Sequence, residues 1–79
     1  GLEYGEATLA VQLERNLRGK RVVLIDDLLA TGGTLNATES LICNLGVKVM
    51  GIMVLIELES LGGRERLSAP VRSLQTYDA

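Results

Sequence analysis

Two adjacent carboxylates and a glycine pair flanked by hydroxyls lie close together in this sequence. Asp26 and Asp27 directly follow the apolar run Val22–Ile25, and Thr31–Thr34 reads Thr-Gly-Gly-Thr. A carboxylate only accepts hydrogen bonds, so it suits hydroxyl donors. Glycines lack the Cβ that would keep an anion away from the backbone N–H groups, and threonine hydroxyls can donate to the same anion. The stretch therefore combines a site for hydroxyls with a site for an anion.

The apolar pattern around these residues predicts the elements that position them. Val22–Ile25 is short and rich in β-branched residues, which indicates a strand buried on both sides. Residues 34–45 place apolar side chains at helical spacing, and residues 47–58 form an extended segment too apolar on both faces for an exposed antiparallel strand. A strand, a loop, a helix and a strand in this order make one right-handed crossover in a parallel sheet. We therefore expect an α/β fold.

The start of the expected helix is a natural place for an anion. Thr34 or Asn36 could cap the helix, with Glu39 in capping-box spacing, and Gly46 lies where a left-handed residue commonly ends a helix. The first turn of a helix leaves backbone N–H groups without partners and carries the positive end of the dipole. Ligands also collect beyond the carboxyl ends of parallel strands. A ribose 5-phosphate, with its diol and its phosphate, fits both halves of the stretch.

The remaining segments extend this unit. Residues 71–77 read as a last, edge strand beyond Pro70, and residues 64–67 read as one helical turn. Residues 8–13 alternate apolar and polar side chains, which favours a strand, although leucines there also recur at helical spacing. No repeat divides the chain, so we expect one domain or part of one.

Length and composition indicate a thin, aliphatic core. The chain has 79 residues, of which 47% are hydrophobic and only two are aromatic, and it has one cysteine and no histidine. A domain of this size buries only about 60–65% of its unfolded surface, and small domains usually need disulfides or metals as well. Because neither is available and the first residue is Gly1 rather than Met, we expect a piece of a larger unit.

Charge and hydropathy argue against two classes of partner. The net charge is −2 and the basic residues are not clustered, so no nucleic-acid partner is expected. The longest apolar run, residues 49–56, is far shorter than the roughly 20 residues of a membrane span. The single Cys43 fits a reducing, cytoplasmic location, and its apolar neighbours indicate a small buried side chain rather than a reactive thiol.

The stretch resembles the phosphoribosyl-diphosphate signature of the type I phosphoribosyltransferases. In that signature an apolar strand precedes Asp-Asp and a loop that ends in Thr-Gly-Gly-Thr, as in Val22–Thr34. Three segments resemble the adenine phosphoribosyltransferases in order and spacing: LEYG at Leu2–Gly5, DDLLATGGTLNA at Asp26–Ala37 and LIELESLGGRERL at Leu55–Leu67. The resemblance covers essentially the whole of this chain but only the carboxyl-terminal portion of the sequences of that family. It implies that residues 1–79 are the C-terminal part of one phosphoribosyltransferase domain, with a partial type I fold.

The resemblance also implies an activity and a set of site residues. The family makes AMP and diphosphate from adenine and 5-phosphoribosyl 1-diphosphate in purine salvage, with Mg²⁺ bound mainly through the substrate diphosphate. Asp26 and Asp27 would hold the ribose hydroxyls and Leu28 would contact the base. Glu3 would transfer a proton at the adenine, on a mobile loop that Tyr4 helps to close, although from the residues alone Glu3 is equally an exposed acid. The 5′-phosphate would bind at Ala30, Thr31, Gly32, Gly33 and Thr34.

Two other functions stay open on the sequence. The family's upstream half supplies most of the adenine pocket and the loop that holds the diphosphate, and these 79 residues contain neither. We therefore expect the isolated piece to be inactive. One alternative is a non-catalytic regulator of the same fold that senses a nucleotide or phosphoribosyl diphosphate, and another is an inactive fragment. The family typically forms homodimers, so a second subunit could complete the thin core.

Overall fold

The computed structural model describes residues 17–78, which form a three-stranded parallel sheet with one α-helix. The strand order is β1-β2-β3, and both strand pairs are parallel. This arrangement confirms the predicted α/β class and the strand-loop-helix-strand unit. The strand predicted at residues 8–13 lies outside the described residues. The elements are β1 (Arg21–Leu29), α1 (Gly33–Asn44), β2 (Lys48–Leu58), the 3-10 helices η1 (Glu59–Leu61) and η2 (Gly63–Arg66), and β3 (Val71–Tyr77).

The strand β1 is longer than the sequence predicted. It continues through Asp26 and Asp27 to Leu29, so the two acids lie within the strand rather than after it. The reason is the length of β2, which offers partners along the whole of β1: Asp26 pairs with Val54 and Leu29 with Glu57. Of the other predicted bounds, those of β3 are confirmed and those of β2 differ by one residue at its start.

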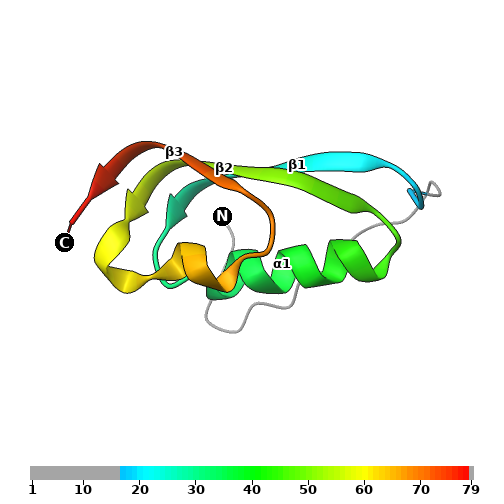
Figure 1. Ribbon diagram of the computed structural model, residues 1–79, viewed down its shortest axis with the longest axis horizontal. Coiled ribbons are helices and arrows are strands. Elements are labelled where there is room, and N and C mark those ends of the chain that lie inside the picture. Colours follow the sequence, from blue (N-terminus) through cyan, green and yellow to red (C-terminus); the bar gives the residue numbers. More distant parts are fainter. Residues whose placement is uncertain (1–16, 79) are drawn as a thin grey trace.

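The core lies between the sheet and α1, which runs along one face of it (Figure 1). No element within residues 17–78 covers the opposite face of the sheet. Val23 is 54% exposed and Ile25 is 74% exposed. Within the described part of the chain, the prediction that Val22–Ile25 is buried on both sides is therefore wrong. Side chains alternate along a strand, and within the described part of the chain a helix covers only one of the two faces. The buried core residues are Leu29, Leu35, Val49, Ile52 and Val54.

The start of α1 differs from the predicted cap. Its N-cap is Gly32, with a φ of 86° and no side-chain capping bond, so the prediction of a Thr34 or Asn36 cap is wrong. Asn36 Nδ2 instead donates to the carbonyl oxygen of Arg66 at 2.6 Å. That partner is distant in sequence, which is why a reading of the helix by itself misses it. At the other end, Gly46 has a φ of 82°, as predicted.

Two further side chains of α1 depart from their predicted roles. Glu39 was expected in a capping box, but it is buried and accepts hydrogen bonds from the backbone N–H groups of Ser68 at 2.9 Å and Ala69 at 2.7 Å. Cys43 is exposed rather than buried, because its place on the helix turns it away from the sheet. A search of the described residues finds no helix with the length and apolar character that crossing a membrane requires.

Candidate functional site

A pocket opens where β1 ends and α1 begins. All strands of the parallel sheet point toward this end of the molecule, and α1 starts there too (Figure 1). The pocket has a volume of about 360 Å³, which lies within the usual range for small-molecule sites. Its lining is one continuous stretch of the chain: Asp26, Asp27, Leu28, Leu29, Ala30, Thr31, Gly32, Gly33, Thr34 and Leu35. All eight site residues predicted between 26 and 34 therefore lie in one pocket.

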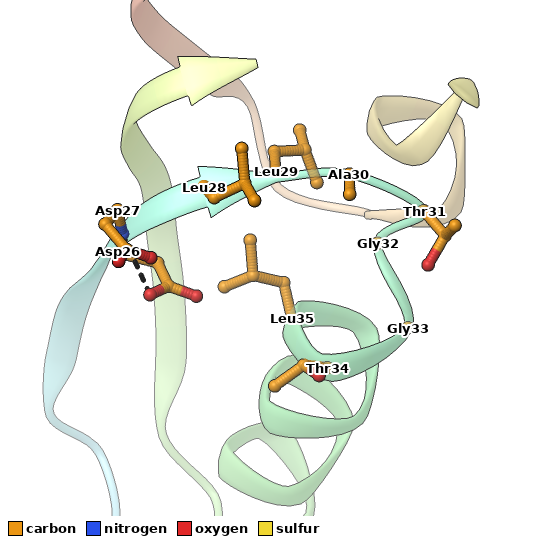
Figure 2. Close-up of a pocket in the computed structure, with 10 residues that line it drawn as sticks. All are labelled: Asp26, Asp27, Leu28, Leu29, Ala30, Thr31, Gly32, Gly33, Thr34 and Leu35. Atoms are coloured by element: carbon orange, nitrogen blue, oxygen red, sulfur yellow. Dashed lines mark hydrogen bonds between the residues drawn. The ribbon is translucent and has the colours of Figure 1, made fainter. Parts of the chain in front are cut away.

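The two acids lie on the strand side of the pocket, across from the helix start (Figure 2). Asp26 is half-buried and Asp27 is exposed. The Asp27 backbone N–H donates to Asp26 Oδ1 at 2.8 Å, which fixes the orientation of that carboxylate. Both acids line the pocket, and none of the lining residues within 17–78 is a cation. The pair is therefore available to hydroxyl donors on a ligand.

The loop Ala30–Thr34, called the glycine loop below, connects the acids to the helix. Its Gly32 takes the left-handed conformation that glycine adopts without strain. The Gly32 carbonyl oxygen accepts the N–H of Asn36 at 2.8 Å, which is the first turn of α1. The N–H groups of Gly33 and Thr34 precede that bond and have no carbonyl one turn earlier in the helix. They supply donors and the positive helix end beside the pocket.

Of the remaining predicted site residues, the structure describes some and leaves two outside the described range. Leu28 is 44% exposed and lines the pocket, so an apolar surface stays open beside the acids. The Thr34 side chain projects from the first turn of α1 (Figure 2). Glu3 and Tyr4 lie outside the described residues.

A third acid near this end of the sheet was not singled out from the sequence. Glu57 on β2 is only 4% exposed. Arg64 binds it with two donors, Nε to Oε2 at 3.1 Å and Nη2 to Oε1 at 2.6 Å, and Ser73 Oγ donates to Oε1 at 2.9 Å. The available signal was a lone acid in the apolar run of β2, since a buried carboxylate needs a partner.

The partners of Glu57 control its ionisation. The hydrogen bonds from Arg64 hold the pKa of Glu57 below its ordinary value of 4.5, against burial, which raises it, and the Ser73 hydroxyl lowers it further. The same pairing raises the pKa of Arg64. Both groups are therefore charged at neutral pH.

Comparison with known proteins gives the same picture of the chain. Residues 3–78 match the family model described as the phosphoribosyl transferase domain. A curated adenine phosphoribosyltransferase of Gluconacetobacter diazotrophicus is 53% identical over 98% of this chain and 44% of its own length. The chain therefore spans less than half the length of that relative.

Solved structures agree. Adenine phosphoribosyltransferase of Thermoanaerobacter pseudethanolicus superposes with a TM-score of 0.75 at 47% identity, over 77% of this chain and 36% of that one. The Trypanosoma brucei enzyme, solved with AMP, pyrophosphate and ribose-5-phosphate, gives a TM-score of 0.66 at 31% identity, over 71% and 28% of the two chains. The family match extends over nearly every residue, and it includes the strand, loop and helix that form the pocket. The chain belongs to the phosphoribosyltransferase family, and the relatives compared here are adenine phosphoribosyltransferases.

Proposed function

We propose that the complete gene product transfers a phosphoribosyl group to adenine in purine salvage and that this chain holds the ribose 5-phosphate end of the substrate. The observation that carries the proposal is the pocket itself. It joins two carboxylates that suit a diol to a glycine loop that suits a phosphate. The 53% identity to a curated adenine phosphoribosyltransferase supports the choice of adenine as the base.

The proposed reaction breaks the bond between the anomeric carbon and the diphosphate and forms a bond from that carbon to a ring nitrogen of adenine. The electron pair leaves with the diphosphate, and the adenine nitrogen loses a proton. Asp26 and Asp27 would orient the sugar by its hydroxyls, and their charges would stabilise positive charge that develops on it. Leu28 would offer its exposed side chain to the base. Glu3 would accept the proton, beside Tyr4.

Mg²⁺ would accompany the diphosphate. Among residues 17–78, no three histidine, cysteine or acidic side chains come together as a metal site. Two neighbouring carboxylates are nevertheless hard oxygen donors, and Mg²⁺ is commonly shared between one or two carboxylates and a substrate's phosphates. When bound, the ion would neutralise charge on the leaving diphosphate.

The proposal extends to the context of the chain. Because the chain spans 44% of the length of its Gluconacetobacter relative, we assign residues 1–79 to the C-terminal part of a single phosphoribosyltransferase domain. The open sheet face, with Ile25 74% exposed, supports coverage by the rest of that domain or by a second subunit of a homodimer. The lone, free Cys43 supports a cytoplasmic location.

The test is an assay of the complete gene product with adenine, 5-phosphoribosyl 1-diphosphate and Mg²⁺. We expect AMP and diphosphate in equal amounts, and no product with guanine or hypoxanthine in place of adenine. Calorimetry with ribose 5-phosphate runs in parallel. Binding without any turnover would favour a regulator of the same fold, and absence of both binding and turnover would overturn the proposal.

A further inference from the structure

The turn Gly62–Arg66, called the supporting turn, packs against the glycine loop, and at Gly63 the contact is backbone to backbone. Gly63 is buried, and a Cβ built on it would collide with the carbonyl oxygen of Ala30 and lie 3.0 Å from the nitrogen of Gly32. A Cβ on Gly32 would in turn lie 2.6 Å from the carbonyl oxygen of Gly63. No side chain fits between the two backbones. The path of the glycine loop therefore depends on where Gly63 lies.

The residue next to Gly63 fixes the supporting turn to the centre of the sheet. Arg64 grips the buried Glu57 with two donors, and its Nη1 donates to the Val71 carbonyl oxygen at 2.7 Å. Glu57 is in register with Leu29 on β1, immediately before the glycine loop. An arginine fork on a carboxylate has a defined geometry that a lysine does not reproduce. This grip therefore restrains Gly63 relative to the strand that leads into the loop.

The far end of the supporting turn holds the start of α1. The Arg66 carbonyl oxygen accepts the Asn36 side chain at 2.6 Å, and Arg66 Nη1 donates to the Thr31 carbonyl oxygen at 3.4 Å. The supporting turn thus contacts the glycine loop at its middle and the helix in its first turn. None of these contacts uses the backbone N–H groups of Gly33 and Thr34, two residues that line the pocket.

We infer that Gly63 and Arg64 are positioning residues for the phosphate end of the substrate, through the glycine loop. This inference rests on the proposed function of the pocket. An anion site made of backbone N–H groups binds tightly only when those groups are already in place, because ordering a loose loop during binding costs free energy. The supporting turn supplies that order from outside the pocket, without touching the ligand.

The test compares two glycine-to-alanine variants of the complete gene product by calorimetry with ribose 5-phosphate. Gly63→Ala displaces the supporting turn from the glycine loop, so we expect the Kd to rise at least tenfold. Gly51→Ala is the matched control, since its added Cβ would meet only the Pro70 carbonyl oxygen at an ordinary 3.7 Å. We expect its Kd to stay within twofold of the unaltered protein. Steady-state kinetics should show a higher KM for phosphoribosyl diphosphate and an unchanged KM for adenine.

A second variant keeps the inference testable if Gly63→Ala does not fold. Arg64→Lys keeps the positive charge but loses the fork, and we expect a Kd for ribose 5-phosphate three to ten times higher in a folded protein. Folded variants that bind like the unaltered protein, or that raise both KM values equally, would overturn the inference and leave the proposed function standing. Failure of the unaltered protein to bind ribose 5-phosphate would remove both.

Discussion

The acids of β1 and the acid of β2 lie at the same end of the sheet, yet they have opposite surroundings. Asp26 and Asp27 line a pocket in which no described lining residue is a cation. Glu57, which is in register with Leu29 of β1, is buried and bound by Arg64 and Ser73. A carboxylate with a fixed arginine partner contributes to stability, whereas carboxylates open to a pocket are available to a ligand. The presence or absence of an arginine partner therefore distinguishes the structural carboxylate from those that can bind a ligand.

The largest expected effect is on the buried pair. Arg64→Met leaves the Glu57 carboxylate buried with only the Ser73 hydroxyl as a side-chain partner, so we expect the free energy of unfolding to fall by about 2–4 kcal/mol. Urea unfolding of the complete gene product measures it. The control is Arg72→Met, which removes an exposed arginine from β3. If both variants lost the same small amount of unfolding free energy, the buried pair would not differ in stability from an exposed arginine, and the proposed contrast would be wrong.

The pH dependence of stability tests the same pair. Because Arg64 holds the folded-state pKa of Glu57 below its ordinary 4.5, the stabilisation is fully present above the unfolded-state pKa and is lost as the pH falls through the folded-state pKa. We therefore measure the free energy of unfolding of the unaltered protein and of Glu57→Gln from pH 7 downward. The difference between the two free energies should become smaller below about pH 4.5. The control is Glu65→Gln, which replaces an exposed acid of η2. A difference in the free energy of unfolding that stays the same at every pH would contradict the lowered pKa of Glu57.

Replacing an acid that lines the pocket should weaken ligand binding and change stability little. Asp27→Asn removes a charged acceptor from the pocket, and we expect ribose 5-phosphate to bind roughly tenfold to a hundredfold more weakly, from the value of a hydrogen bond to a charged group. Stability should change by less than about 0.5 kcal/mol, as is usual for an exposed side chain. Asp78→Asn, beyond the end of β3, is the control. An unchanged affinity in calorimetry would refute the role given to the acid pair.

The smallest effect is expected at the glycine loop's hydroxyl. Thr34→Val removes one neutral donor, worth about 0.5–1.5 kcal/mol, while the backbone donors of the loop remain. We expect a loss of affinity for ribose 5-phosphate of roughly twofold to tenfold. The control is Thr76→Val on β3, which is exposed and lies outside the pocket. A loss as large as that of Asp27→Asn would mean that side chains, and not backbone, dominate the anion site.

Much of the fold was predictable because its signals are local. The apolar runs predicted the parallel strands, and Gly46 marked the end of α1. The predicted helix cap was wrong because Asn36 and Glu39 instead bind partners in a segment that is distant along the chain. The open face of β1 was also missed, since an apolar run reveals that a side chain can be buried and not which element covers it.

The sequence by itself determined the chemistry of the pocket: adjacent carboxylates, a glycine pair and hydroxyls within one continuous stretch, all brought together by a single turn from strand to helix. Only the tertiary structure decided what supports that stretch. The contact between Gly32 and Gly63, and the grip of Arg64 on Glu57, join residues from separate turns and strands. Such pairings depend on how the chain crosses itself in space, and periodicity along the sequence carries no record of that crossing.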